Sequence, residues 1–167
     1  LKILVDLLKE QVHASCTNLN PDEVVIGGSC ASLSVSSPKI FREFNLPVVK
    51  EVAKICREYD IPCHLHVCGK SRAIVDMVAD TDLSVMEPLE RSPSGDVNLA
   101  EVKAKYGLKL CLKGNIHTIE TMLNGTEKTV EQEVKKCIRD AGEGGGYVLS
   151  TGDQVPNMTP EKNFIAL

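Results

Sequence analysis

The fold of this chain is decided around residues 61–69, which read Ile61-Pro62-Cys63-His64-Leu65-His66-Val67-Cys68-Gly69. Apolar residues flank the histidines as in a buried β-strand, and side chains two apart on a strand share a face. His64, His66 and Cys68 are therefore expected to point the same way near the C-terminal end of this strand. Imidazole and thiolate groups are zinc ligands, and a catalytic zinc site uses three protein ligands with one open position. The stretch thus predicts a metal or catalytic site, although any one of these residues alone is more often a packed core group.

Short apolar runs alternate with helical patterns on both sides of this stretch. Further strands are predicted at 23–26, 83–86, 109–113 and 147–151, the fourth stopping at Gly114-Asn115. Helices are predicted at 1–16, 38–44, 47–59, 71–79, 99–106, 116–123 and 127–141, with a last one opening at 159–161. This alternation is typical of a parallel sheet covered by helices, so the chain is predicted to be an α/β protein.

Length and composition indicate an ordinary globular protein. The 167 residues suit a single domain over 1–167, and the hydrophobic fraction of 43% allows a substantial core. A formal charge of -4 gives no basic footprint for nucleic acid or for an anionic membrane. The sequence has no apolar run of bilayer length and no signal-peptide pattern at its start, which predicts a cytoplasmic location.

The seven cysteines show no regular spacing, and reduced thiols are expected. Most of them should be small buried groups. Cys68 is the exception because it follows two histidines. The chain also begins without an initiator methionine, which suggests a piece cut from something longer.

Polar residues and glycines follow each predicted strand. In barrels and doubly wound sheets the chemistry gathers at the carboxyl ends of the strands. The residues at these ends are Gly27, Gly28, Ser29, His66, Cys68, Glu87, Glu90, Asn115, His117, Gly152 and Asp153. They are the candidate site residues, although polar residues after strands are expected in any loop.

Taken in order, these segments resemble the C-terminal half of the uroporphyrinogen decarboxylase superfamily, and within it the corrinoid-dependent methyltransferases more than the decarboxylase. The matching pieces are Ser36-Ser37-Pro38, Phe41-Arg42-Glu43-Phe44, Leu46-Pro47, His66-Val67-Cys68-Gly69, Leu112-Lys113-Gly114-Asn115-Ile116, Gly145-Gly146-Tyr147-Val148-Leu149-Ser150-Thr151-Gly152, Pro156 and Thr159-Pro160-Glu161-Lys162-Asn163. Each is weak singly, but the order and spacing are fairly specific to the superfamily.

The resemblance implies a TIM-type (β/α)8 barrel with a cleft at the carboxyl ends of the strands. About five βα units are visible, so the chain would hold strands four to eight of such a barrel. An open sheet with exposed apolar edges is a liability, so the chain is expected either to self-associate into a homo-oligomer or to rearrange.

In the methyltransferases that the chain resembles, zinc is held by a His-x-Cys pair and a further cysteine after the last strand. The pair corresponds to His66 and Cys68. The third position is Asp153, because this chain reads Ser150-Thr151-Gly152-Asp153. Aspartate ligates zinc through oxygen, which would make the site harder and less electron-rich than one with two thiolates.

The resemblance also implies roles for the remaining candidates. Glu87, Asn115 and His64 are predicted as catalytic residues that hydrogen-bond the substrate or the metal ligands, and Glu90 is as readily a solvated loop residue. Gly28, Ser29 and Gly114 are predicted to bind the cofactor.

The function implied is transfer of a methyl group from a corrinoid, carried by a partner protein, to a small thiol or folate-like acceptor. Zinc would assist as a Lewis acid where it is bound. The alternatives are a metal-free porphyrinogen decarboxylase, a metal-free methyltransferase with a folate-like acceptor, which Asp153 in place of cysteine favours, and a non-catalytic fragment. Neither nucleic acid nor a membrane is expected as a partner.

Overall fold

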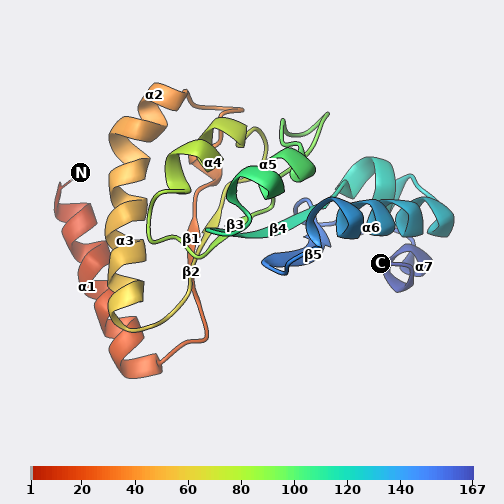
Figure 1. Cartoon of the computed structure of the whole chain (residues 1–167). Coiled ribbons are helices and arrows are strands. Elements are labelled where there is room, and N and C mark those ends of the chain that lie inside the picture. The colour runs from red at the N-terminus through yellow and green to blue at the C-terminus, as the bar shows by residue number, and fades with distance from the viewer. Residues whose placement is uncertain (1) are drawn as a thin grey trace.

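The computed structural model describes residues 2–167, and its centre is one five-stranded parallel sheet (Figure 1). The strands are β1 (Val24–Gly27), β2 (Cys63–His66), β3 (Val85–Glu87), β4 (Cys111–Ile116) and β5 (Tyr147–Thr151). They lie in the order β1-β2-β3-β4-β5, and each neighbouring pair is parallel. The predicted α/β class and parallel sheet are confirmed. Spatial order equal to chain order is the arrangement of a βα barrel.

Helices lie near the predicted places, with one short addition at residues 29–31, where no helix was predicted. They are α1 (Lys2–Leu19), η1 (Ser29–Ala31), α2 (Pro38–Ile40), η2 (Phe41–Asn45), α3 (Leu46–Glu58), α4 (Arg72–Val78), α5 (Leu99–Tyr106), η3 (Thr118–Leu123), α6 (Glu127–Ala141) and α7 (Glu161–Ile165). Leu1, where the first predicted helix starts, lies outside the described residues. Within residues 2–167 no helix combines the length and the apolar character needed to cross a membrane.

The two helices predicted at 38–44 and 47–59 form one continuous helical segment. Ser37 caps its start, with the side-chain oxygen accepting from the Ile40 N–H at 3.2 Å. The break expected before Pro47 does not occur, because η2 is a widened π-type turn in which the Leu46 N–H bonds the carbonyl of Phe41. A proline inside a regular helix clashes with the carbonyl four residues earlier, and a wider turn relieves that clash.

Strand β4 is longer than predicted. It was expected to stop at Gly114-Asn115, but it pairs with β5 as far as Ile116, opposite Thr151. Gly114 makes this possible: its φ is +134°, and a Cβ there would lie 1.9 Å from the Pro88 carbonyl oxygen. The helix predicted from Ile116 correspondingly begins at Thr118.

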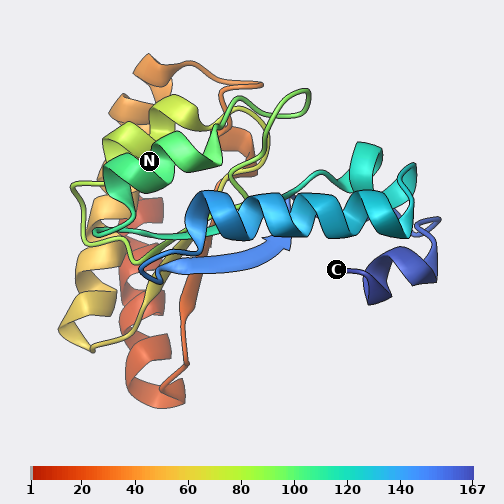
Figure 2. The same ribbon diagram turned by 45° about the vertical axis from the view of Figure 1, so that its right-hand side comes forward.

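The two faces of the sheet differ in their cover. Leu65, Met86 and Leu112 are at most 1% exposed and pack into the core under the helices. Val25 and Val148 point to the other face and are 53% and 46% exposed. Figures 1 and 2 show the helices arranged around one side of the strands. The second face, which would be the inside of a barrel, is open in this chain.

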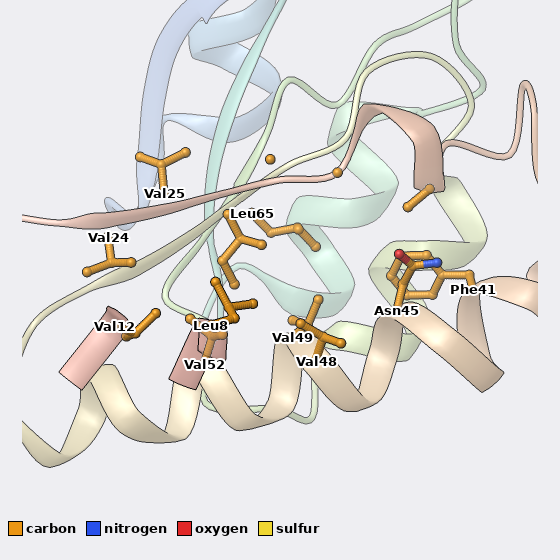
Figure 3. A pocket seen from close by; sticks show the side chains of 14 residues that line it. Leu8, Val12, Val24, Val25, Phe41, Asn45, Val48, Val49, Val52 and Leu65 are labelled. Atoms are coloured by element: carbon orange, nitrogen blue, oxygen red, sulfur yellow. The ribbon is translucent and has the colours of Figure 1, made fainter. Parts of the chain in front are cut away.

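An apolar cavity of about 280 Å³ lies beside the edge strand β1, between α1 and α3 (Figure 3). Leu8 and Val12 line it from α1, and Val49 and Val52 from α3. Figure 3 shows Val24 directed toward these helices, as the two-residue alternation of a strand requires. Packing at this edge is therefore less complete than at the centre of the sheet.

Asp76 links α4 to α5. Its Oδ1 accepts from Arg72 Nη1 at 2.8 Å, from Lys105 Nζ at 3.2 Å and from the Tyr106 hydroxyl. Burial raises the pKa of Asp76, but the hydrogen bonds from these three groups outweigh it and bring the pKa to about 2. The ionised carboxylate therefore stabilises the folded state.

We expect Asp76→Asn to lower the free energy of unfolding at pH 7. Because the pKa is lower in the folded than in the unfolded chain, this stabilisation is complete above about pH 4 and is lost as the pH falls through about 2. The side chain is 43% exposed, so the effect should not exceed about 1 kcal/mol. Urea unfolding of both proteins across this range measures the difference.

Asp80→Asn is the matched control. Asp80 pairs with Lys109 on the surface, where the two side chains are 76% and 60% exposed, so its replacement should change the free energy of unfolding less than Asp76→Asn does. A deficit of Asp76→Asn that stays constant down to the lowest pH would contradict the role given to its charge.

Candidate metal centre

Three of the predicted ligands meet at the carboxyl ends of the strands. His66 ends β2, Cys68 lies two residues further on, and Asp153 follows β5. One ligand atom of each lies within 4.8 Å of the others, and His66 Nε2 is 3.9 Å from Asp153 Oδ1. All three side chains are half-buried, so they are held in place and still reachable from solvent. The fold thus brings together residues that are 85 positions apart in the chain, from Cys68 to Asp153.

The donor set suits a zinc ion. Zinc accepts imidazole nitrogen, thiolate sulfur and carboxylate oxygen, and three such ligands leave a fourth position for substrate. The thiolate and carboxylate together balance the double positive charge. The residues present therefore fit the metal that the resemblance implies, and whether they bind it stays a prediction.

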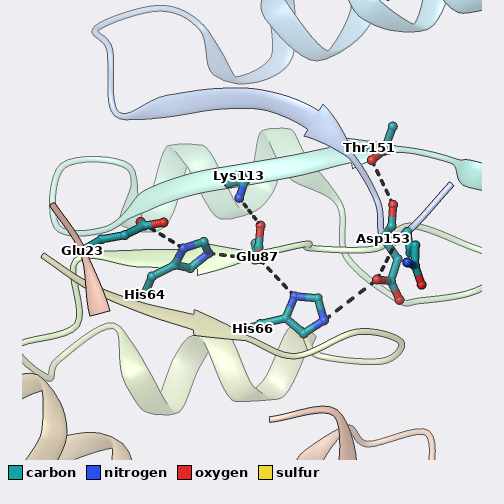
Figure 4. Close-up of polar contacts among 8 residues, drawn as sticks. Glu23, His64, His66, Glu87, Lys113, Thr151 and Asp153 are labelled. Carbon is teal, nitrogen blue, oxygen red and sulfur yellow. Dashed lines mark hydrogen bonds and ion pairs between the residues drawn. The ribbon is translucent and has the colours of Figure 1, made fainter. Parts of the chain in front are cut away.

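Glu87 orients His66. Its Oε1 lies 3.0 Å from His66 Nδ1, so Nδ1 is the donor and Nε2 is left to face Asp153 (Figure 4). Its other oxygen, Oε2, is 2.5 Å from Lys113 Nζ. Burial raises the pKa of Glu87, but hydrogen bonds from Lys113 and His66 outweigh it and leave the pKa below its usual value. A carboxylate that holds the second nitrogen of a metal-binding histidine is a common arrangement.

His64 does not join the cluster. It is 1% exposed, with Nδ1 3.3 Å from Glu23 Oε2 and Nε2 3.4 Å from Glu87 Oε1, where Nε2 makes no hydrogen bond. The two-residue repeat predicted that His64, His66 and Cys68 converge. That prediction is corrected, because β2 ends at His66 and Cys68 turns with the following loop toward Asp153. His64 instead lies between Glu23 and Glu87.

Glu90 is buried, at 9% exposure, and not a solvated loop residue. Its carboxylate accepts from the backbone N–H of Gly69, next to Cys68. Burial and the charge of Asp153 raise the pKa of Glu90, against the effect of the hydrogen bond from Gly69. The contact ties down the loop that carries Cys68.

Asn115 and His117 lie outside the cluster, and their side chains form hydrogen bonds with backbone groups. The Asn115 amide donates to the Leu89 carbonyl at 2.8 Å and accepts from the Cys137 thiol at 3.6 Å. His117 Nδ1 accepts from the N–H groups of residues 119 and 120 at the start of η3. The catalytic role predicted for Asn115 gains no support from its position, since both ends of its amide are already bonded inside the protein.

The predicted cofactor-binding residues occupy three different settings. The Gly28 N–H donates to the His66 carbonyl at 2.7 Å, and a Cβ at Gly28 would lie 2.9 Å from that oxygen. Gly114 is packed against Pro88, as described above. Ser29 is exposed at the start of η1. The first two therefore have structural reasons to be glycine, and cofactor binding at all three stays a prediction.

Cys68 differs from the thiols of the core. Cys16, Cys56, Cys63 and Cys137 are buried, and burial raises the pKa of Cys56 to about 11 and that of Cys63 further. Such thiols are inert at neutral pH. Cys68 is only half-buried and lies beside a histidine and a carboxylate, so it is the reactive candidate.

Sequence reasoning missed Lys113 and Glu23. Lys113 is on the open face of β4 and pairs with Glu87, while Glu23 precedes β1 and contacts His64. The alternation of β4 carried a signal, because Leu112 must point into the core and Lys113 must therefore point away from it. Nothing in the local sequence indicated the partner of Glu23.

Comparison with known proteins gives the context of this geometry. The family model described as "Uroporphyrinogen decarboxylase (URO-D)" matches residues 1–167. The methylcobamide:CoM methyltransferase MtaA of Methanosarcina barkeri is 32% identical over 146 residues, which are 87% of this chain and 40% of the relative. MtbA of Methanosarcina mazei is 27% identical over 147 residues, or 86% of this chain and 39% of the relative.

A decarboxylase is similar to about the same degree. The uroporphyrinogen decarboxylase of Pseudoalteromonas translucida is 27% identical over 163 residues, which are 95% of this chain and 42% of the relative. The chain thus spans about two fifths of the length of the curated relatives it matches.

One solved structure, a methyltransferase from Methanosarcina mazei, superimposes with a TM-score of 0.78 at 24% identity and covers 96% of this chain and 45% of that one. This likeness shows the fold. The five βα units form part of a TIM-type barrel, as the sequence predicted.

Proposed function

Because the chain belongs to the uroporphyrinogen decarboxylase family, whose model matches residues 1–167, we propose that it acts in methyl transfer. The donor would be a methylated corrinoid on a partner protein, and the acceptor a small thiol or a folate-like molecule. The observation that carries this proposal is the His66–Cys68–Asp153 cluster at the carboxyl ends of the strands. A decarboxylase needs no such donor set.

The relatives also support methyl transfer, but not a particular acceptor. Two of those described are named methylcobamide:CoM methyltransferases, and their names contain both a corrinoid donor and a thiol acceptor. At 27% and 32% identity, over two fifths of their length, they make an enzyme of methyl transfer plausible without specifying the acceptor.

In this proposal each residue has a defined task. His66, Cys68 and Asp153 would hold zinc, which supplies Lewis acidity that keeps a bound thiol ionised at neutral pH. Glu87 keeps His66 Nδ1 protonated, and Glu90 keeps the Gly69 backbone in place. With a methylated corrinoid as the donor substrate, the acceptor would form the new bond to the methyl carbon with its own electron pair as the Co–C bond breaks. The pair of that bond would stay on cobalt, which passes from Co(III) to Co(I), and the thiol proton would go to solvent.

Asp153 bears on the choice of acceptor. An oxygen ligand in place of a second thiolate donates less electron density, so a bound thiolate should be a weaker nucleophile. A folate-like acceptor therefore stays within the proposal. We place the protein in a reducing compartment such as the cytoplasm, because Cys68 has to stay out of a disulfide to bind metal.

The second candidate is a porphyrinogen decarboxylase. It is favoured by the relative from Pseudoalteromonas, which matches over 95% of this chain, and by the absence of a cysteine at residue 153. In that case the Asp153 carboxylate would contact the substrate and would not bind a metal.

We also propose that residues 1–167 fold as one domain and that the open face of the sheet promotes homo-oligomers. Val25 and Val148 on that face, at 53% and 46% exposure, support this. Light scattering that shows a well-dispersed monomer would count against it.

The proposed function is tested with the purified zinc-loaded protein and methylcob(III)alamin. We expect a small thiol or tetrahydrofolate to be methylated, with cob(I)alamin appearing in the absorption spectrum in equal amount. Uroporphyrinogen III is the parallel substrate. Its decarboxylation by metal-free protein, with no demethylation of the corrinoid, would replace the proposal with the second candidate.

A further inference from the structure

A chain of polar contacts crosses the open face of the sheet next to the proposed metal ligands. It runs from Glu23 through His64 and Glu87 to Lys113, with His66 branching from Glu87 (Figure 4). Glu87 is the centre of this chain. Its side chain is 16% exposed, and that of Lys113 is 30% exposed, so solvent screens their contact only in part.

Two histidines compete for the same oxygen of Glu87. Oε1 lies 3.0 Å from His66 Nδ1, to which it is hydrogen-bonded, and 3.4 Å from His64 Nε2, to which it is not. A small rotation of the carboxylate would exchange these partners. His66 would then lose the acceptor that fixes its ring.

Lys113 acts against that rotation. Its ammonium group is 2.5 Å from Oε2, the other oxygen of Glu87. Within residues 2–167 it is the only lysine or arginine paired with Glu87, since the other side chains within 4 Å of that carboxylate in such contacts are the two histidines. A charge-assisted bond on one oxygen fixes the direction of the other.

We propose that Lys113 is a positioning residue of the metal centre. By holding Oε2 of Glu87, it keeps Oε1 on His66 Nδ1 and thereby keeps His66 Nε2 directed at Cys68 and Asp153. The inference rests on the proposed function, because it assumes that this cluster binds a metal. It goes beyond that function because it gives Lys113, which contacts Glu87 and is not one of the three proposed ligands, a part in the metal affinity of the site.

The test compares Lys113→Met, Lys113→Arg and the control Lys109→Met. Zinc affinity is measured by competition with a chromophoric chelator, and the geometry of the site by the absorption bands of bound cobalt(II). We expect Lys113→Met to weaken zinc binding about tenfold, in the range known for residues that support metal ligands, and to change the cobalt(II) bands. Lys113→Arg should restore most of the affinity, because it can donate to the same oxygen.

Lys109→Met removes a lysine that lies four residues before Lys113 and pairs with Asp80 on the surface, so it should leave both readouts unchanged. A merely structural role of Lys113 would lower the midpoint of thermal unfolding without altering the cobalt(II) bands of the folded fraction. That result would overturn the inference.

The outcomes separate the inference from the proposed function. If the unchanged chain binds zinc and Lys113→Met binds it equally well, only the role of Lys113 fails. If the unchanged chain binds neither zinc nor cobalt(II), both fail together. Should Lys113→Met not fold, Lys113→Gln and Glu87→Gln form a double-mutant cycle, in which purely additive losses of affinity would contradict the coupling.

Discussion

With His66 replaced by alanine, the protein is expected to bind zinc at least about 100-fold more weakly than the unchanged chain, since one of three protein ligands is lost. The loss should exceed that of Lys113→Met, because His66 Nε2 faces the cluster directly and Lys113 acts through Glu87. Equilibrium dialysis followed by metal analysis measures the affinity, and Cys68→Ser should give a loss of the same order.

His13→Ala is the matched control for this experiment. His13 lies on α1, where its Nδ1 is 3.2 Å from the Tyr59 hydroxyl, and it has no contact with the cluster. His64→Ala should fall between the two, since His64 touches Glu87 and none of the three ligands. Equal zinc affinity of the His66 and His13 variants would mean that any bound metal sits elsewhere, and the proposed function would lose its main support.

The sheet was predictable because each strand can be recognised from its own local sequence. The apolar runs around Leu65, Met86 and Leu112 are bounded by glycines, prolines and polar turns, and their residues are nearly unexposed in the structure. Hydrophobic patterning decides such elements locally. Spacing alone could not have brought Asp153 to His66, because contacts between distant strand ends depend on the register of the whole sheet. The resemblance to a known family supplied that pairing.

Errors arose where backbone contacts override local preference. Pro47 signals a helix break, yet the π-type turn at 41–45 absorbs it. Gly114 signals a strand end, yet β4 continues because the missing side chain admits the Pro88 carbonyl. Whether a proline or a glycine ends an element or allows a close approach depends on neighbours far away in the chain.

Polar residues were the hardest to place. Asn115 and His117 follow the predicted end of the fourth strand, where catalytic groups are expected, but their side chains satisfy backbone groups of Leu89 and of η3. A buried backbone donor or acceptor needs a partner, and the sequence does not reveal which side chain provides it. Lys113 is the opposite case. It was not predicted as a site residue, yet it pairs with Glu87 beside the proposed metal ligands.

Gly114→Ala is expected to lower the free energy of unfolding by about 2–5 kcal/mol. A Cβ at this position would lie 1.9 Å from the Pro88 carbonyl oxygen, and φ is +134°, which L-residues rarely adopt. Backbone strain and forced displacement contribute about 1–2 and 1–3 kcal/mol respectively. Gly144→Ala is the control, since its φ of +75° is also strained but nothing lies within 4 Å, and it should cost only about 1 kcal/mol. Urea unfolding at neutral pH measures both.

The same substitution reaches the metal centre through its neighbours. Gly114 follows Lys113 and Pro88 follows Glu87, so the close approach of the two backbones sets the distance across which the Lys113–Glu87 pair forms. Folded Gly114→Ala protein should therefore also bind zinc more weakly, by a factor similar to that of Lys113→Met, whereas Gly144→Ala should not. Equal loss of stability in the two glycine variants would show that Pro88 yields to the added methyl group, and Gly114 would then have no special part in spacing β3 from β4.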